Sequence, residues 1–248
     1  MAAPTGYGQF CPVAMAAEVL CTRWTVLLLR ELIAGSTRFN ELRRGVPRMS
    51  PALLSTRLKE LEEAGIVSRT LGAEPGVYEY RLTTAGEDLR DVVMSIGNWG
   101  QRWVETQLSP QNLDPSLLMW DMRRNLVTRP MPKRKCVIEF IYGDLAPQRR
   151  NWWLIVTPDV PVDLCSVDPG LNVDLFVTCE LKTMTAVWMG LTTVTAEIHD
   201  ERLVLTGDVE LSRSMQAWLG LSPFAREKKR VVGWAPGPRL SEARRKRM

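Results

Sequence analysis

Residues 35–86 read GSTRFNELRRGVPRMSPALLSTRLKELEEAGIVSRTLGAEPGVYEYRLTTAG, and this stretch decides the fold of the first half of the chain. It predicts a short helix over residues 38–44, followed by a turn that holds Gly45 and Pro47. A second helix and two strands are expected after the turn. This order of elements predicts a winged helix-turn-helix.

The second helix is expected to begin at Ser50, because a serine hydroxyl can accept a hydrogen bond from an unpaired backbone N–H and Pro51 suits the first helical position. Gly65 is expected to end it. One face carries apolar side chains at a spacing that buries them together, namely Leu54, Leu58 and Leu61. The opposite side is small, hydroxylated and basic, with Ala52, Thr56 and Lys59 flanked by Ser55 and Arg57. Such a face suits a helix that enters the major groove of DNA.

Two short strands are expected over residues 66–71 and 77–82, and the turn between them is rich in Gly and Pro. These strands would form the wing. The turn carries Glu74, where a basic residue would suit DNA better. Insertion of the wing tip into the minor groove is therefore less expected than binding by the second helix.

Several short motifs occur in an order and spacing that resemble the HxlR-type winged-helix transcriptional regulators, which are relatives of the MarR type. The motifs are Cys11-Pro12-Val13, Arg23-Trp24-Thr25, Arg38-Phe39-Asn40-Glu41-Leu42, the run from Ser50-Pro51 to Gly65-Ile66-Val67, and Tyr80-Arg81-Leu82-Thr83 with Gly86. The resemblance covers roughly the first 110 residues. It implies binding to double-stranded DNA as a homodimer.

Composition places the chain among ordinary globular proteins. At 248 residues, two domains are expected, and the hydrophobic fraction of 45% and charged fraction of 24% are unremarkable. No apolar run approaches the length of about 18 residues that a membrane span needs. The N-terminus has no signal-peptide pattern, and the five cysteines form no paired spacing. A cytoplasmic protein without membrane association is expected.

Bulk charge does not by itself predict DNA binding. The formal net charge is +4, yet the first 108 residues hold 12 basic and 12 acidic side chains. Binding must therefore come from local patches. The residues expected to contact DNA are Arg43, Arg44, Arg48, Ser50, Pro51, Ala52, Ser55, Thr56, Arg57, Arg69 and Arg81. Arg57 is the preferred candidate for guanine or phosphate, and the alternative is that it pairs with Glu60, as Lys59 would pair with Glu63.

Three further helices complete the N-terminal domain, which is expected to span residues 1–108. Two are predicted over 13–20 and 24–33, the second apolar almost all round and therefore buried. A third begins near Thr83 or Thr84 and continues to about Leu108. Its apolar positions include two tryptophans, which favours a dimerisation helix, and the alternative is packing against the second domain.

The second half predicts an α+β domain with an antiparallel sheet. A linker is expected at 109–116, a domain at 117–225 and a basic flexible tail at 226–248. Strands are expected over 137–142, 151–157, 160–167, 172–178 and within 197–206, and helices over 116–126, 181–189 and 215–219. The runs Val173-Asp174-Leu175-Phe176-Val177 and Leu203-Val204-Leu205-Thr206-Gly207-Asp208, each followed by a Trp-containing helix, resemble sterol-carrier-protein-like domains.

That resemblance implies an apolar small-molecule effector in a cavity between the sheet and the helices. Aromatic and methionine side chains suit such a lining, although they also fill ordinary cores. The candidate lining residues are Phe140, Trp152, Trp153, Leu154, Phe176, Leu181, Met184, Trp188, Met189 and Trp218.

Cys11 is a candidate redox sensor, because it precedes Pro12 at a helix start, where a thiolate is favoured. In some relatives of the HxlR type a cysteine in this position senses oxidants or electrophiles, and the alternative is a small packing residue. Catalysis is not expected, since the single histidine, His199, lies in a predicted turn and no phosphate loop, nucleophile elbow or metal pattern occurs.

The leading hypothesis is a sequence-specific transcriptional regulator that is controlled by an apolar ligand and needs no cofactor. Thiol sensing through Cys11 is one alternative, and a lipid carrier or protein-interaction module without DNA binding is another.

Overall fold

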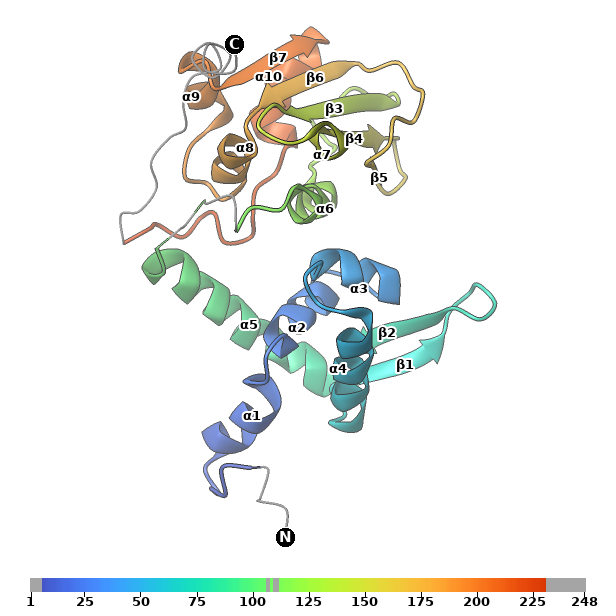
Figure 1. Ribbon diagram of the computed structural model, residues 1–248, viewed down its shortest axis with the longest axis vertical. Coiled ribbons are helices and arrows are strands. Elements are labelled where there is room, and N and C mark those ends of the chain that lie inside the picture. The colour runs from blue at the N-terminus through green and yellow to red at the C-terminus, as the bar shows by residue number, and fades with distance from the viewer. Residues whose placement is uncertain (1–5, 106–107, 109–111, 231–248) are drawn as a thin grey trace. The chain divides into compact units, whose positions relative to one another are not determined.

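The computed structural model describes residues 6–105, 108 and 112–230. The chain forms two compact units, Met1–Gly97 and Asn98–Met248, and each is described by itself (Figure 1). Residues 109–111 of the expected linker lie outside the described residues. The expected domain limits of 1–108 and 117–225 remain predictions.

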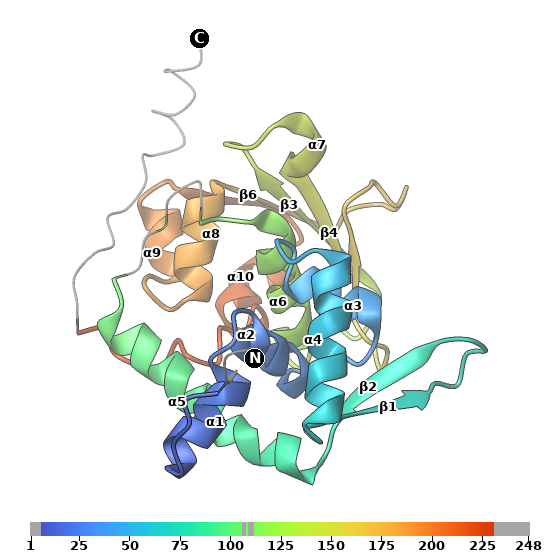
Figure 2. The same cartoon turned by 60° about the horizontal axis from the view of Figure 1, so that its bottom comes forward.

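The N-terminal unit contains the predicted winged helix-turn-helix. Its elements are α1 (Pro12–Leu20), α2 (Thr25–Ile33), α3 (Phe39–Gly45), α4 (Pro51–Glu63), β1 (Val67–Leu71), β2 (Tyr78–Leu82) and the start of α5 (Thr84–Trp103). The strands β1 and β2 pair antiparallel from Val67↔Leu82 to Leu71↔Tyr78. This hairpin extends away from the helices and forms the wing (Figures 1 and 2).

The core of this unit is built around α2 and α4. The predicted stripe Leu54, Leu58 and Leu61 is buried, and it packs with Leu28 and Leu29 of α2 in one cluster. Each such leucine stabilises the fold by about 1.5–3 kcal/mol relative to an exposed one. α2 is a core helix as predicted, with Leu28, Leu29 and Leu32 buried, although Leu27 is exposed on its other side.

A buried carboxylate joins α2 to the end of α3. Glu31 is fully buried and pairs with Arg30 at 2.6 Å. Arg30 also donates a hydrogen bond from Nη2 to the carbonyl of Gly45 at 2.9 Å. Gly45 leaves room for this arrangement, because a Cβ atom there would lie 1.9 Å from Cδ of Glu31. The turn before the second helix is therefore fixed against α2.

Replacing Gly45 by Ala is expected to destabilise the N-terminal unit by about 1–3 kcal/mol, because the added methyl group overpacks the site around Glu31. Urea denaturation followed by circular dichroism measures the change. Gly100→Ala, in the part of α5 that belongs to the C-terminal unit, is the control for the added methyl group, since nothing lies within 4 Å of its Cβ position and the N-terminal unit is expected to keep its stability. Equal losses of stability in both variants would contradict the role of Gly45.

The C-terminal unit is a mixed sheet with helices. Its elements are α6 (Pro115–Asn125), β3 (Cys136–Tyr142), α7 (Pro147–Arg150), β4 (Asn151–Val156), β5 (Asp163–Cys165), β6 (Leu175–Cys179), α8 (Leu181–Trp188), α9 (Val194–His199), β7 (Leu203–Gly207) and α10 (Val209–Trp218). The strand order is β5-β4-β3-β6-β7.

The sheet is not wholly antiparallel, and the prediction is wrong at one pair. β3 and β6 run parallel, with Ile138 opposite Leu175, whereas the other neighbours are antiparallel. After β5 the chain crosses back past β4 and β3, so β6 joins the free side of β3 in the same direction. The strand pattern along the sequence does not encode this order.

A second difference concerns residues 197–206. The predicted strand signal begins inside α9, which ends at His199, and β7 begins only at Leu203. Glu201 lies between them with φ of 58°, in the left-handed region. His199 therefore ends α9, and the turn predicted at His199 begins one residue later, at Asp200.

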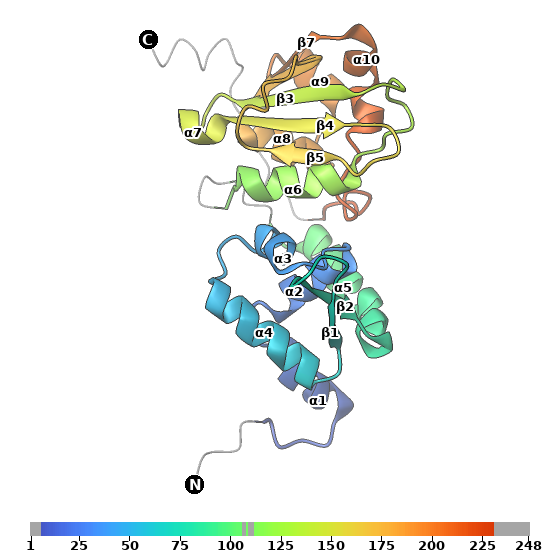
Figure 3. The ribbon, with the colours of Figure 1, turned by 90° about the vertical axis from the view of Figure 1, so that its right-hand side faces the viewer.

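One face of the sheet packs against helices. Side chains of α6, α8 and α10 meet alternate residues of β3, β4 and β6 in a single core, and the strands lie in front of α8 in Figure 3. The members from the helices include Met119, Met122, Met184, Trp188, Met215 and Trp218.

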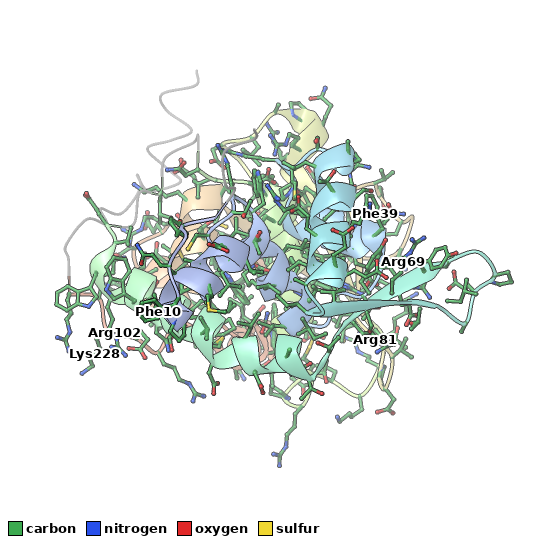
Figure 4. The ribbon with its side chains drawn as sticks, turned by 90° about the horizontal axis from the view of Figure 1, so that it is seen from below. Phe10, Phe39, Arg69, Arg81, Arg102 and Lys228 are labelled. Atoms are coloured by element: carbon green, nitrogen blue, oxygen red, sulfur yellow. The ribbon has the colours of Figure 1, made fainter. Side chains whose placement is uncertain are left out.

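Residues 226–230, the first part of the expected tail, contact the end of α5. Glu227 pairs with Arg102 at 2.6 Å, and the Arg230 guanidinium lies 5.2 Å from the centre of the Trp103 ring. Arg102 and Lys228 both lie near the end of α5 (Figure 4). The rest of the expected tail lies outside the described residues.

Candidate nucleic-acid interface

The second helix of the motif, α4, begins as the sequence predicts. The hydroxyl of Ser50 accepts a hydrogen bond from the backbone N–H of Leu53 at 3.3 Å, and Pro51 occupies the first turn. The φ of Gly65 is +70°, so the chain turns where only glycine is unstrained. Both ends of α4 are therefore capped, and no residue of its exposed face takes part in either cap.

The exposed face of α4 carries small and hydroxylated side chains. Ala52, Ser55 and Thr56 are all exposed, and they lie away from the buried stripe. The Thr56 hydroxyl donates a hydrogen bond to the carbonyl of Ala52 at 3.0 Å. Its lone pairs and its methyl group remain on the surface. Lys59 is exposed on the same side and pairs with Glu63 at 3.5 Å, as the alternative interpretation proposed.

Arg57 does not lie on this face. It flanks the buried stripe, and its side chain pairs with Glu60, which is the ion pair that the alternative interpretation proposed. Its Nε also donates a hydrogen bond to the carbonyl of Arg23 at 3.3 Å. Arg57, which the sequence favours for contact with guanine or phosphate, therefore points toward the corner between α1 and α2, residues 21–24.

Three arginines flank the start of α4. Arg43 and Arg44 lie in the last turn of α3, and Arg48 lies in the turn that follows. All three are exposed. A positive charge beside the N-terminus of a helix provides a place for phosphate, because the backbone N–H groups there also favour an anion.

The wing arginines have partners within the hairpin. The Arg69 guanidinium lies 3.7 Å from the centre of the Tyr78 ring, and Arg81 pairs with Glu79 at 2.6 Å. Both lie along the hairpin (Figure 4). Contact with DNA would require each of them to leave or share these partners.

Arg38 was not among the predicted site residues, and it links the wing to α3. It occupies the N-cap position of α3 and pairs with Glu74 of the wing at 2.8 Å. The hydrogen bond that Arg38 donates to the Glu74 carboxylate raises the pKa of Arg38. Glu74 therefore has a structural partner, and a basic residue at the wing tip would repel Arg38. The acidic residue Glu74 at the wing tip was the feature of the sequence that could have indicated its ion pair with Arg38.

None of the ten predicted ligand-binding residues lines the cavity of about 500 Å³ that the C-terminal unit contains. Most of them are core residues, including Phe140, Leu181, Met184 and Trp218. Trp153 and Phe176 flank Glu139 on the opposite face of the sheet. These residues therefore pack in or beside the core, and a role in binding a ligand stays a prediction.

A different part of the C-terminal unit contains a cavity of about 500 Å³. Its lining comes from α9, β7 and α10 with the turn before β7, namely Val194, Thr195, Ile198, Glu201, Leu203, Val204, Leu205, Ser212, Arg213 and Gln216. The apolar members come mostly from β7 and α9. Sequence reasoning missed this set because its members come from three separate elements and share no spacing along the chain.

Cys11 is exposed at the N-cap position of α1, directly before Pro12. Cys21 is also exposed and caps the other end of the same helix. Among the described residues, no group of three or more His, Cys, Asp or Glu side chains is placed to hold a metal ion. No single described helix could cross a membrane by length and composition, and α1 with α2 pass that test only as a pair bent by 83°.

The sequence matches the family described as HxlR-like helix-turn-helix over residues 19–108. The uncharacterized HTH-type transcriptional regulator YvaP of Bacillus subtilis is 37% identical over 99 residues, which are 39% of this chain and 92% of that protein. A second relative, the uncharacterized HTH-type transcriptional regulator Rv3095 of Mycobacterium tuberculosis, is 39% identical over 40% of this chain and 62% of its own length.

A solved structure with similarity to this chain is the reduced form of the transcriptional regulator YodB from B. subtilis. It is 35% identical, and the match covers 38% of this chain and 93% of that one, with a TM-score of 0.34. The relatives are named as regulators, not enzymes, in agreement with the expectation that this chain is not an enzyme. Through its N-terminal part, with the helix-turn-helix and wing described above, the chain belongs to the HxlR-like family of helix-turn-helix transcriptional regulators.

Proposed function

We propose that this chain regulates transcription by binding specific sites in double-stranded DNA through α4. The observation that carries the proposal is the division of α4 into two sides. One side buries Leu54, Leu58 and Leu61, and the other exposes small and hydroxylated residues near the N-terminus of the helix. An α-helix of this kind fits the major groove, which is about 12 Å wide.

Ser55 and Thr56 are the residues assigned to base edges. A hydroxyl can donate to or accept from any base, and the threonine methyl group can contact the methyl group of thymine. Ala52 leaves space for close approach of the helix. Ser50 and Pro51 lie at the helix start, where backbone N–H groups would face a phosphate.

Arg43, Arg44 and Arg48 are assigned to the phosphate backbone. Each phosphate that a protein cation neutralises releases condensed counterions, so affinity falls as salt rises. Arg69 and Arg81 are weaker candidates, because stacking and ion pairing within the wing already occupy them.

Arg43→Ala is expected to reduce the slope of log K against log salt concentration by about 0.9, the value for one phosphate contact on duplex DNA. Binding to sites selected from a random DNA pool, measured by fluorescence anisotropy at several salt concentrations, gives the slope. Arg90→Ala is the matched control, because Arg90 lies on α5 and pairs with Glu87. An unchanged slope for Arg43→Ala, or an equal change for both, would argue against this phosphate contact.

A homodimer is the assembly proposed for DNA binding. Large apolar side chains are exposed on α1 and on the part of α5 in the N-terminal unit, namely Val13, Met15, Val19, Val92 and Ile96. A surface of this kind marks an interaction site. Two recognition helices related by a twofold axis would read half-sites separated by one helical turn, roughly 34 Å.

Ile96→Asp is expected to convert the dimer to a monomer, because burying an unpaired carboxylate in an interface is unfavourable. Sedimentation equilibrium at micromolar concentration distinguishes the two states. Leu71→Asp is the control, since Leu71 is an exposed apolar residue of the wing, 69% exposed compared with 49% for Ile96. A monomeric wild-type chain, or a dimer that survives Ile96→Asp, would refute this interface.

The input, meaning the signal that controls DNA binding, is proposed to be an apolar small molecule bound in the cavity between α9, β7 and α10. Its volume lies within the range of about 300–1,000 Å³ that is typical of ligand pockets. The N–H of Val194 donates a hydrogen bond to Oε1 of Gln216 at 2.7 Å, and Arg202 pairs with buried Glu197 at 2.6 Å. These contacts fix both ends of α9, so the cavity exists before a ligand binds. The likeness to sterol-carrier-like domains stays a prediction.

Thiol sensing through Cys11 is the second candidate input. The observation that favours it is the exposure of this thiol at the start of α1. Oxidation of Cys11 would act on a helix that also carries part of the proposed dimer surface. A separate cavity in the C-terminal unit supports the ligand input more directly.

Two variants separate these inputs. Ile198→Asp is expected to weaken binding of 8-anilino-1-naphthalenesulfonate, an apolar fluorescent anion, because it places a carboxylate in the cavity lining. Val160→Asp on an exposed turn is the control.

If the ligand input is correct, diamide leaves DNA affinity unchanged in the wild type and in Cys11→Ser. A loss of affinity with diamide that Cys11→Ser abolishes would favour the thiol input instead.

A further inference from the structure

Arg57 lies in the recognition helix but is withdrawn from its exposed face. The residue follows Leu54 by three positions and precedes Leu58 by one, so it borders the buried stripe. Its side chain is 17% exposed, whereas that of Lys59 in the same helix is 76% exposed. A guanidinium so placed cannot extend into a groove without leaving its present partners.

Those partners lie on two elements. Nη1 pairs with Glu60 one turn along α4, which compensates the charge. Nε donates to the backbone carbonyl of Arg23 at 3.3 Å, across 34 residues of sequence. The forked guanidinium can bind a carboxylate and a carbonyl at the same time, which a lysine ammonium does less well. Arg57 thus joins the recognition helix to the corner between α1 and α2.

The corner has an unusual backbone. Trp24, the N-cap of α2, has φ of 80° and makes no side-chain capping bond. Bulky residues rarely adopt this left-handed conformation, and they do so where surrounding contacts enforce it. The carbonyl that Arg57 binds belongs to the peptide directly before Trp24. The Arg23 guanidinium also lies 5.5 Å from the centre of the Trp24 ring.

The corner also sets the place of α1. No residue of α1 is buried, so the helix has little packing of its own within the unit. Its position depends on the chain from Cys21 to Trp24, where Thr25 N–H bonds to the carbonyl of Thr22 at 3.1 Å. A shift of α1 would therefore move the carbonyl that Arg57 binds.

We propose that Arg57 is a positioning residue that couples the α1–α2 corner to the recognition helix, and not a base-reading residue. The proposal rests on the DNA-binding function proposed above. It makes the corner the route by which packing of α1 against a second copy of the chain orients α4 for the groove.

The test compares the full-length wild type with Arg57→Ala, Arg57→Lys and the control Lys59→Ala. Hydrogen exchange of the Thr25 and Leu28 amides is measured in the free protein, because both amides bond to carbonyls of the corner. DNA affinity is measured at several salt concentrations for a selected site, for its single-base variants and for unrelated DNA.

Both Arg57 variants are expected to exchange these two amides faster and to bind the selected site about tenfold more weakly, as for loss of one hydrogen bond of a charged group. The salt slope and the ranking of the single-base variants stay unchanged. Lys59→Ala leaves both amides at the wild-type rate. The Arg57→Lys variant keeps the charge and guards against a folding failure of Arg57→Ala.

Three results would overturn the proposal. Unchanged exchange in both Arg57 variants would show that the residue does not support the corner. A slope reduced by about 0.9 in Arg57→Ala but not in Arg57→Lys would show a phosphate contact. Loss of preference at one base pair would show base reading. If the wild type binds no DNA, the proposed function fails, and amide exchange still decides the positioning role.

Discussion

The buried carboxylate of Glu31 is the constraint on which the arrangement of the N-terminal unit depends. A charge removed from water is tolerated only with close partners. Arg30 supplies the charge partner, and the same guanidinium reaches the carbonyl of Gly45 at the end of α3. One charged pair thus fixes the junction between the two helices of the motif. The start of α4 follows directly from that junction.

The contacts of Arg57 and Arg38 extend the same principle to the rest of the unit. Arg57 bonds to the carbonyl before Trp24, and Arg38 pairs with Glu74 in the wing. Each arginine joins elements that are distant in sequence. The basic residues of a DNA-binding domain therefore divide into two groups. Some hold the scaffold together through ion pairs, and others, such as Arg43, lie exposed beside the recognition helix.

The C-terminal unit also contains a buried ion pair, which lies beside its cavity. Glu197 is buried and pairs with Arg202, which fixes the end of α9. Gln216 fixes the beginning of the same helix. Because the two ends are held, the space between α9, β7 and α10 stays open. Most of the aromatic residues expected to line a ligand cavity are members of the core of this unit.

The sequence by itself determined the local structure of the recognition motif. Ser50, Gly65 and the leucine stripe act through contacts within a few residues, so periodicity and capping rules were sufficient to place α4 and the wing. Only the tertiary structure decided which arginines are exposed, because Arg57 and Arg38 find partners 34 and 36 positions away. It also decided the parallel pairing of β3 with β6 and the position of the cavity, since both depend on how distant segments meet. Spacing along the chain records which residues share a face, and it does not record what that face meets.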